Sequence, residues 1–318
     1  MPTLSVIIPA TDRPATLDRC LAAIDASSDR PDEVIVVDAP AELSAAAARN
    51  AGARSATGDV LVFVDADVEV HADAIGRIRS VLADRAEVTA VFGSYDDEPA
   101  DTSPVSAFRN LLHHHVHHDG AGPAETFWTG LGAVRRERFE TVGGFDEERF
   151  VHPSIEDVEL GMRLAAAGDR LLLDPSIQGT HLKRWTLRSM VHTDLFRRGI
   201  PWVTLLLRER RVPAGLNLGW RHRATALLSV VTVVALLRRR WAALLGALVV
   251  VAGLNRALYA LLVRRLGAVG AVAGVPLHLL HHLTAVVAVP LGLLAGYRER
   301  RTTSPHSNSA PRATGATA

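Results

Sequence analysis

Short apolar runs alternate with amphipathic stretches over the first part of the chain. The apolar runs have the length and β-branched content of buried strands, and the stretches between them repeat apolar residues at helical spacing. We expect strands at residues 4–8, 33–37, 60–64 and 88–92, and helices at 15–26, 43–53 and 75–82. This βαβαβ order predicts an α/β domain with a mostly parallel, doubly wound sheet.

The pattern changes in the last third of the chain. Residues 224–295 are almost wholly Ala, Val, Leu and Gly between clusters of Arg, which is typical of a helical membrane region. We expect the α/β domain at 1–190, an interfacial amphipathic segment at 191–220, two or three transmembrane helices at 221–298 and a disordered tail at 299–318.

Two arrangements of the membrane region fit the sequence. Residues 224–237 are short for a span, which needs about 20 residues, whereas 241–263 and 268–297 are long enough. Three spans would place Arg238, Arg239 and Arg240 outside the cell. One re-entrant or interfacial segment followed by two spans keeps these arginines on the cytoplasmic side. We prefer this second arrangement because cytoplasmic loops are enriched in Lys and Arg.

Composition narrows the class of protein. A net charge of +1 argues against nucleic acid as the main partner. Cys20 is the only cysteine, so the chain forms no internal disulfide, which suits a reducing compartment. The first residues lead into a strand without a basic, apolar leader, so we expect no signal peptide. The expected location is the cell membrane, as a multi-pass protein whose catalytic domain is cytoplasmic.

Two acids close the predicted strand at 60–64. Asp65 and Asp67 are two residues apart, so in an extended segment both carboxylates point to the same side. Like charges held this close favour a cation, and Mg²⁺ is commonly held by one or two carboxylates together with substrate phosphates. The carboxyl edge of a parallel sheet is also where such folds bind ligands. The pattern therefore indicates a site for a metal ion and a diphosphate, with a solvated acidic turn as the alternative.

The turn after the first strand argues against two other classes of nucleotide-binding protein. Residues 9–14 read PATDRP and contain no glycine. A Rossmann dehydrogenase carries a Gly-rich turn at this point, and a nucleotidyltransferase usually carries a Gly-rich phosphate loop. We expect neither class.

Six segments resemble, in order and spacing, the motifs of family 2 glycosyltransferases with the GT-A fold. The resemblance covers residues 3–200 and rests on VIIPA at 6–10, VIVVD at 34–38, ARNAG at 48–52, VDAD at 64–67, VGGFD at 142–146 and ED at 156–157. It implies a GT-A domain, a nucleotide-sugar donor, and Mg²⁺ or Mn²⁺ as the cofactor.

The resemblance implies a role on the donor side for several of these motifs. Asp38 would bind the base or ribose, Arg49 and Asn50 would lie near the donor, and Gly52 would let the chain turn closely. A capping or turn-forming Asp38, and an exposed helix end at Arg49 and Asn50, are the structural alternatives. Where the family continues with a second acid and Gly-Ser, this chain has Ala-Pro-Ala at 39–41. The donor-binding residues that the resemblance implies are Pro9, Ala10, Asp38, Arg49, Asn50, Asp65 and Arg184.

The segment HLKRW at 181–185 resembles a motif that ends in Arg-Trp and lines the acceptor channel of processive family members. Histidine stands here at the first position, and other family members use a late histidine as a metal ligand. The resemblance therefore implies that His181 binds the cation with Asp65 and Asp67. It also implies that Arg184 binds the diphosphate and Trp185 the acceptor. With this departure the chain resembles the non-processive type.

The resemblance also implies positions for the acceptor and the general base. Trp128 and Gly130 would contact the acceptor, with core packing as the alternative for Trp128. Asp157 would remove a proton from the acceptor hydroxyl, with Glu156 in a supporting role. Ser154 and Asp157 also resemble a capping box at a helix start, which is compatible with that role.

Two further segments have alternative interpretations. Five histidines lie within residues 113–118, where they indicate either a metal site or a solvated or membrane-surface segment. Residues 185–211 mix Leu, Phe, Ile and Trp with several arginines. They predict a basic amphipathic piece at the lipid interface, with a docking helix of the soluble domain as the alternative.

Together these features predict an inverting, metal-dependent glycosyltransferase. It would move a sugar from a nucleotide-sugar donor to a lipid or lipid-linked acceptor at the cytoplasmic membrane face. A synthase that charges a polyprenyl phosphate with sugar is the alternative enzyme. A catalytically inactive membrane scaffold with the same fold is the alternative from a different class, and the joint presence of Asp65, Asp67 and Asp157 argues against it.

Overall fold

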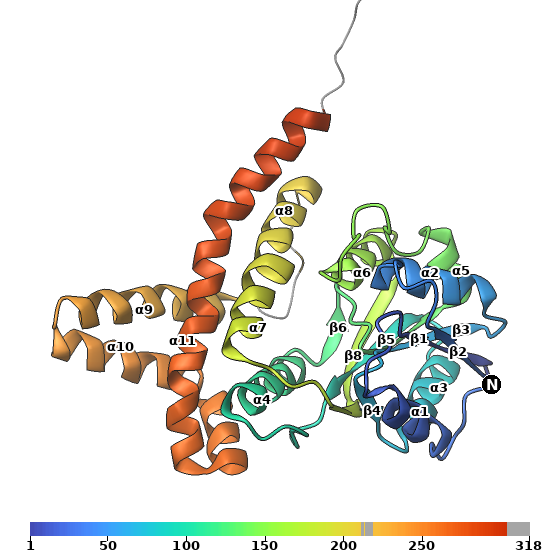
Figure 1. Ribbon diagram of the computed structural model, residues 1–318, viewed down its shortest axis with the longest axis horizontal. Helices are drawn as coiled ribbons and strands as arrows, with labels where there is room; N and C mark the ends of the chain where they lie inside the picture. The colour runs from blue at the N-terminus through green and yellow to red at the C-terminus, as the bar shows by residue number, and fades with distance from the viewer. Residues whose placement is uncertain (211–212, 214–218, 304–318) are drawn as a thin grey trace, which may run out of the picture.

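The computed structural model describes residues 1–210, 213 and 219–303 (Figure 1). Within these residues an eight-stranded sheet has the order β2-β1-β3-β7-β5-β8-β4, with β6 paired to β8. The strands are β1 (Leu4–Pro9), β2 (Glu33–Val37), β3 (Val60–Val64), β4 (Val68–Val70), β5 (Val88–Tyr95), β6 (Gly122–Ala124), β7 (Leu131–Arg135) and β8 (Arg170–His181).

Helices surround the sheet and then form a separate group at the C-terminal end (Figure 1). Those of the sheet domain are α1 (Leu17–Asp25), α2 (Ala45–Ser55), α3 (Ala74–Asp84), α4 (Pro104–Asp119), α5 (Arg136–Thr141) and α6 (Glu156–Ala166). The later helices are α7 (Leu187–His192), the π-helix η1 (Thr193–Gly199), α8 (Ile200–Glu209), α9 (Trp220–Leu237), α10 (Trp241–Leu254) and α11 (Arg256–Thr303). All the strands and helices expected from the apolar pattern are present, with ends that differ by a few residues.

The sheet is mixed, which corrects the expectation of a mostly parallel sheet. β1 pairs in parallel with β2 and β3, and β5 pairs in parallel with β8. β7 lies antiparallel between β3 and β5, while β4 and β6 lie antiparallel to β8. The apolar pattern of a strand does not encode its direction, which is set by the path that the chain takes back to the sheet.

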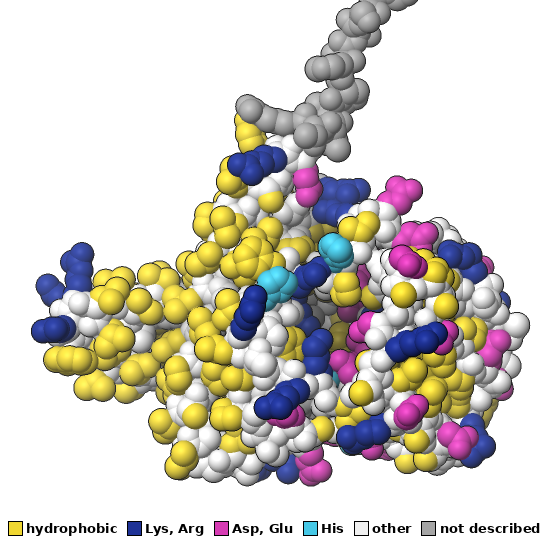
Figure 2. Space-filling model, viewed as in Figure 1, with side chains coloured by type: hydrophobic (Ala, Val, Ile, Leu, Met, Phe, Trp, Pro, Cys, Tyr) yellow, Lys and Arg dark blue, Asp and Glu magenta, His cyan; other side chains and the backbone are white. Residues whose placement is uncertain are grey.

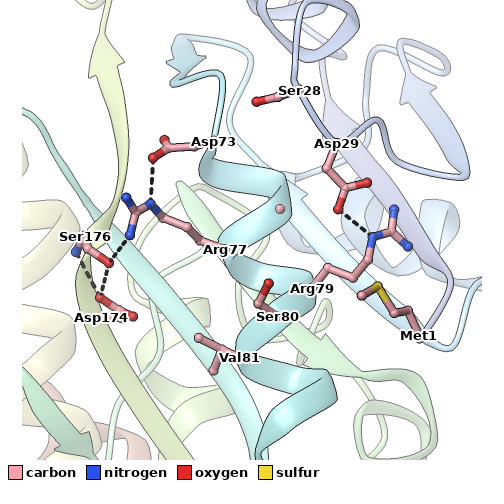
Figure 3. A pocket seen from close by; sticks show the side chains of 11 residues that line it. Met1, Ser28, Asp29, Asp73, Arg77, Arg79, Ser80, Val81, Asp174 and Ser176 are labelled. Carbon is pink, nitrogen blue, oxygen red and sulfur yellow. Dashed lines mark hydrogen bonds and ion pairs between the residues drawn. The ribbon is translucent and has the colours of Figure 1, made fainter.

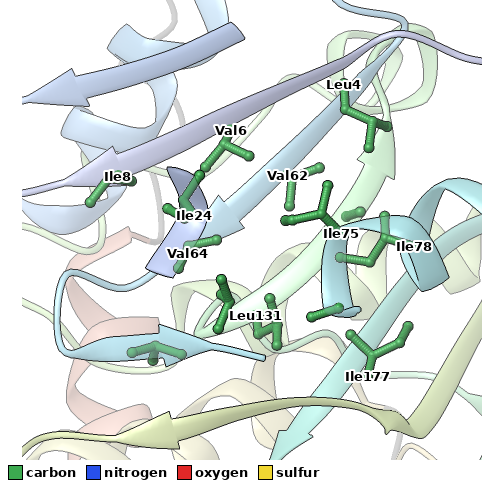
Figure 4. Packing of buried hydrophobic residues seen from close by; sticks show 14 of the residues in the cluster. Leu4, Val6, Ile8, Ile24, Val62, Val64, Ile75, Ile78, Leu131 and Ile177 are labelled. Atoms are coloured by element: carbon green, nitrogen blue, oxygen red, sulfur yellow. The ribbon is translucent and has the colours of Figure 1, made fainter. Parts of the chain in front are cut away.

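Apolar residues fill both faces of the central strands because helices cover the sheet on both sides. On one face Val60, Val62 and Val64 pack with alternate residues of β1 and with α1 and α3 (Figure 4). On the other face Leu61 and Phe63 pack with residues of α2, α5 and α6. This alternation is the two-residue period of a strand, and it explains why β3 is an unbroken apolar run.

Three parallel strands end at one edge of the sheet. β1, β2 and β3 end at Pro9, Val37 and Val64, and the register pairs Pro9 with Val37. Asp38 and Asp65 follow directly at this carboxyl edge, where open α/β sheets bind their ligands.

Gly52 lies inside α2, which corrects its expected role in a close turn. A Cβ atom at this position would lie 2.5 Å from Cγ2 of Ile7 on β1. The absence of a side chain therefore lets α2 pack closely on the sheet, and this packing brings Arg49 and Asn50 to its carboxyl edge.

The C-terminal helices pack on the sheet domain through α4. Phe108 and Leu111 of α4 form a buried cluster with Trp185 and with residues 258–262 of α11. α8 packs along α11, and the hairpin of α9 and α10 projects away from them (Figure 1). α11 has a break at Gly267, where φ is 70°.

Two helices of the described chain are long and apolar enough to cross a membrane. They are α9, with 18 residues, and Arg256–Glu299 within α11, whereas α10 is a shorter apolar helix. Figure 2 shows hydrophobic side chains over the hairpin of α9 and α10, with basic side chains at its tip, where residues 238–240 lie. α11 continues to Thr303, beyond the expected end of the membrane region at 298. Residues 304–318 of the expected tail, and residues 211–212 and 214–218 of the expected interfacial segment, lie outside the described residues.

Replacing Phe63 with Ala should lower the free energy of unfolding by about 3 to 5 kcal/mol, because the ring is fully buried. It packs against the rings of Phe139 and Phe145, with centroids 5.6 and 5.2 Å away. Denaturant titration of the purified chain in detergent, followed by near-UV circular dichroism, measures the change. Val34→Ala, on an exposed position of β2, is the control and should change stability by less than about 0.5 kcal/mol. Equal stability of the two variants would contradict this packing.

Candidate active site

Asp65 and Asp67 lie in a turn between β3 and β4 at the carboxyl edge of the sheet. The Val68 backbone N–H donates to the Asp65 carbonyl at 2.9 Å, and the Leu182 N–H donates to the Asp67 carbonyl at 2.8 Å. Because β4 pairs with the end of β8, Val68 lies opposite His181. The result is a distance of 3.6 Å between His181 Nε2 and Asp67 Oδ2.

His181 and Asp67 form a pair that fits a divalent cation. The imidazole is buried and stacks on Tyr95 with ring centroids 4.1 Å apart, which fixes its orientation. Burial raises the pKa of Asp67, but the interactions with His181 and Lys183 outweigh it, so the pKa is lowered and the carboxylate is favoured. A carboxylate oxygen and an imidazole nitrogen are both suitable ligands for a divalent metal. The described residues contain no group of three or more acids, histidines or cysteines placed to hold one ion, so substrate phosphates and water would supply the other ligands.

Asp65 is instead bound by Arg49 of α2. The Arg49 guanidinium is 6% exposed and donates to Asp65 Oδ1 at 2.7 Å and to Glu156 Oε1 at 2.9 Å. Burial alone would lower the pKa of Arg49, but the two carboxylates outweigh it and raise the pKa. The described arrangement therefore joins Asp65 to Glu156 through a buried cation, separately from the pair of Asp67 and His181.

Glu156 is fully engaged in holding the start of α6. One of its oxygens accepts from Arg49, and the other accepts from the Ser154 backbone N–H at 2.8 Å. The capping-box interpretation implied that the Ser154 hydroxyl caps α6. The hydroxyl does not do so. It donates to the Arg197 carbonyl of η1 at 2.7 Å, and Ile155 is the N-cap residue.

Asp157 lies beside the segment predicted to contact the acceptor. Its Oδ2 accepts from the Thr129 N–H at 3.3 Å, and its Oδ1 accepts from its neighbour Val158 at 2.8 Å. The next residue after Thr129 is Gly130, whose carbonyl accepts from the Asp65 N–H at 3.2 Å. Asp65 and Asp157 are therefore hydrogen-bonded to consecutive residues of one segment.

The environment of Asp157 favours proton uptake. Burial raises its pKa to about 6, and the neighbouring Glu156 carboxylate acts in the same direction. Arg49 and the two backbone N–H donors oppose this shift in part. A carboxyl group with a pKa in this range can exchange protons near neutral pH, as a general base must.

Trp128 forms one wall of this region and is half-buried. Its indole contacts Tyr95 and His113, with ring centroids 4.9 and 4.7 Å away. A Cβ atom at Gly130 would lie 2.2 Å from Trp128 Cζ2, so the absence of a side chain at Gly130 leaves space for the indole. The side chain belongs in part to the core and in part to the accessible surface.

His114 and His117 of α4 are buried, whereas His113 and His115 are half-buried and His118 is exposed, so the expectation of a solvated or membrane-surface segment is corrected in part. The Nδ1 atoms of His114 and His117 lie 3.0 and 2.8 Å from the carbonyls of Tyr95 and Gly93 on β5. Burial lowers the pKa of His117 to about 4, which favours the neutral ring. Helical spacing places His113, His114 and His117 on the face of α4 that packs on the sheet. The metal interpretation has no support in the described residues, which hold no suitable group of ligands.

Three residues predicted to bind the donor have other contacts. Asn50 donates to the Phe145 carbonyl at 2.8 Å and accepts from its N–H at 2.9 Å, so it clamps the VGGF segment. Arg184 is 78% exposed and pairs with Asp101 at 3.6 Å. Asp38 is at the predicted edge but is 52% exposed and pairs with Arg13 at 3.6 Å. Pro9 and Ala10 lie at the same edge, where the Ala10 N–H donates to the Val37 carbonyl at 2.9 Å.

Trp185, predicted to contact the acceptor, is 7% exposed in the cluster between α4 and α11. The Arg109 guanidinium lies over the Trp185 ring, 5.1 Å from the ring centroid. The backbone N–H of Trp185 donates to the Ser106 hydroxyl at 2.7 Å. These contacts give it a packing role at the junction with the C-terminal helices.

A surface pocket of about 580 Å³ beside α3 contains none of the predicted site residues (Figure 3). Its lining includes Met1 and Asp29, which precede β1 and β2 and thus belong to the amino ends of these strands. Ion pairs of Arg77 with Asp73 and of Arg79 with Asp29 occupy its walls. The chemistry predicted from the sequence therefore lies at the opposite ends of the strands.

Residues 39–143 match the family model described as glycosyl transferase family 2. The chain resembles this family within that segment. Two validoxylamine A glucosyltransferases, from Streptomyces hygroscopicus subsp. limoneus and subsp. jinggangensis, are each 28% identical to it over 222 residues. These alignments cover 53% of this chain and 49% and 52% of the relatives, so the chain spans about half the length of the curated relatives it matches.

A solved structure has a similar fold over the sheet domain and the helices after it. The mannosyltransferase PcManGT of Pyrobaculum calidifontis, in complex with GDP-Man and Mn²⁺, matches with a TM-score of 0.54 at 18% identity. The match covers 91% of this chain and 87% of that chain. The predicted GT-A class of α/β fold is confirmed.

Tyr95 and Thr129 are site residues that the sequence analysis missed. Tyr95 ends β5 and stacks on His181, and Thr129 donates to Asp157. A tyrosine that ends a buried strand is a detectable signal, because the carboxyl ends of strands that run in the same direction gather at one edge of the sheet. Thr129 carries no such signal, because it contacts Asp157 through its backbone N–H, and the path of the loop sets the direction of that group.

Arg49→Gln should lower the free energy of unfolding by roughly 3 to 5 kcal/mol, because it leaves Asp65 and Glu156 without their shared buried cation. Thermal and denaturant unfolding of the purified chain measure the change. Arg13→Gln is the control, since its pair with Asp38 is exposed, and it should leave stability nearly unchanged. A similar small effect for both variants would contradict the role of Arg49.

Proposed function

We propose that the chain is an inverting, metal-dependent glycosyltransferase that moves a sugar from a nucleotide-sugar donor to a hydroxyl of a lipid or lipid-linked acceptor at a membrane surface. The observation that carries the proposal is a pair of hydrogen bonds, which join Asp65 to Gly130 and Asp157 to Thr129. This arrangement gives one small region both a donor side, at the end of β3, and a candidate base with a raised pKa, at the start of α6.

Asp157 is the general base in this proposal. It accepts the proton of the acceptor hydroxyl while the oxygen attacks the anomeric carbon from the side opposite the leaving group. The new bond from carbon to oxygen forms as the bond to the diphosphate breaks, so the sugar is transferred with inversion and a nucleoside diphosphate leaves. Glu156 supports the base indirectly, since its own oxygens are bound by Arg49 and Ser154.

Asp67 and His181 would hold the Mg²⁺ or Mn²⁺ ion, and Asp65 lies beside them at the same turn. The ion would offset negative charge on the departing diphosphate. The donor nucleotide would lie along Pro9, Ala10 and Asp38 at the carboxyl edge. Arg49 acts on the donor side through Asp65, and the proposal gives no substrate contact to Asn50, Arg184 or Trp185.

The apolar C-terminal helices support a lipid or lipid-linked acceptor. Side chains such as Leu227, Leu245 and Val269 are more than half exposed, an arrangement that favours contact with lipid over water. Figure 2 shows a hollow between the sheet domain and these helices, in which basic and acidic side chains meet. An acceptor head group held at the membrane would approach the sheet domain through this hollow. In this proposal residues 1–190 are catalytic and the helices after residue 220 are the membrane anchor.

Purified protein in detergent should release nucleoside diphosphate when given Mn²⁺, extracted lipids and the correct nucleotide sugar. The donor panel should contain GDP-mannose and nucleoside-diphosphate glucoses, because the fold relative holds GDP-Man and the curated relatives are glucosyltransferases. Removing the metal with a chelator should stop release, and adding Mn²⁺ should restore it. No release with any donor in the panel, under conditions where PcManGT is active, would count against the proposal.

Asp157→Asn should reduce kcat by at least about 100-fold while leaving donor binding intact, because the amide cannot accept the proton. In the unchanged protein kcat/KM should rise with pH through about 6, since the raised pKa keeps the base protonated below that value. Initial rates across pH 4.5 to 8, chosen as roughly two units around that pKa, and donor-induced thermal shifts measure the two effects. Loss of donor binding in the variant would indicate a structural role for Asp157.

A further inference from the structure

The π-helix η1 connects the C-terminal helices with the sheet domain. It spans Thr193–Gly199, between α7 and α8, and is wider than the helices on either side. Such π segments are uncommon and occur often at functional sites.

Asp194 fixes η1 from two sides. Its carboxylate is 4% exposed and lies 3.0 Å from Arg109 Nη1 of α4 and 2.9 Å from His281 Nδ1 of α11. Burial raises the pKa of Asp194, but Arg109 and His281 outweigh it and lower the pKa to about 2. A buried carboxylate with two partners of this kind resists displacement, because moving either partner leaves a charge without compensation.

The same helix contacts the loop that precedes the candidate base. The Arg197 carbonyl of η1 accepts from the Ser154 hydroxyl at 2.7 Å. Ser154 in turn donates its backbone N–H to Glu156 Oε2, and Glu156 Oε1 accepts from Arg49. Polar contacts and a short stretch of backbone therefore run from His281 on α11 to Arg49 at the donor side, and pass next to Asp157.

The loop before α6 depends on such external contacts for its position. Residues 151–154 form no helix or strand, and Val151, His152 and Pro153 are exposed. Ser154 is the point at which this loop meets η1, three residues before Asp157. An anchored loop matters for a general base, because a displacement of about 1 Å can cost about 100-fold in rate.

We infer that Asp194 and Ser154 are positioning residues: Asp194 fixes η1, and Ser154 transmits that position to Asp157 through the Arg197 carbonyl. The inference rests on the proposed function and extends it, because it makes the C-terminal helices part of the catalytic unit as well as a membrane anchor. In this inference the two residues affect the placement of the base and not the binding of the donor.

Ser154→Ala and Asp194→Asn test this inference in the full chain in detergent. Each should lower kcat about 10-fold or more and leave the donor KM within about 2-fold, because the base is displaced while the donor side stays intact. Ser154→Thr keeps the hydroxyl and should restore kcat. Ser154→Ala removes one partly exposed hydroxyl, so it provides a result even where Asp194→Asn fails to fold.

Asp97→Asn is the matched control. Like Asp194, Asp97 is an acid that pairs with α11, in its case through Arg264 and Arg265. Asp97 lies in the sheet domain and has no contact with η1 or with the loop before α6 among the described hydrogen bonds and ion pairs. It should leave kcat unchanged. An equal loss of kcat in Asp97→Asn, or a raised donor KM with normal kcat in Ser154→Ala, would overturn the inference.

The outcome for the unchanged protein separates the two proposals. If it releases nucleoside diphosphate and Ser154→Ala matches its kcat, the positioning role is wrong and the proposed function stands. If the unchanged protein releases none with any donor, the proposed function and the inference that rests on it are both overturned.

Discussion

The buried guanidinium of Arg49 is the interaction on which the candidate site depends. It joins Asp65, at the end of β3, to Glu156, at the start of α6. Charges in an apolar interior are tolerated only when each has its partner, so α2, β3 and α6 are held in one arrangement. The close packing of α2 on β1 at Gly52 places Arg49 at that point. Asp157 follows Glu156 directly, and burial next to that carboxylate raises its pKa.

Antiparallel strands complete a site that the parallel strands only begin. The parallel strands bring Asp38 and Asp65 to one edge. The pairing of β4 with β8 places His181 beside Asp67. The segment that leads into β7 places Gly130 beside Asp65 and Thr129 beside Asp157. A site assembled in this way depends on the late part of the domain as much as on the central strand.

The C-terminal helices combine an apolar surface with polar contacts to the sheet domain. Exposed apolar residues on α9, α10 and α11 suit a lipid environment, whereas α4 and α11 share a buried apolar cluster around Trp185. Asp194 adds charged contacts to the same junction. In the proposed function, helices joined in this way would anchor the protein to the membrane and restrain it relative to the candidate site, which a flexible tether would not achieve.

The sequence by itself determined the strands and helices of the first half, the carboxyl edge and its acids, and the apolar character of the last third, because these follow from local periodicity and composition. The GT-A class was also predictable, from ordered motifs. Only the tertiary structure decided the mixed direction of the sheet, the pairing of Arg49 with Glu156, the interior place of His117 and the burial of Trp185. Each of these depends on contacts between residues far apart in the chain, and local pattern carries no information about which distant segments meet.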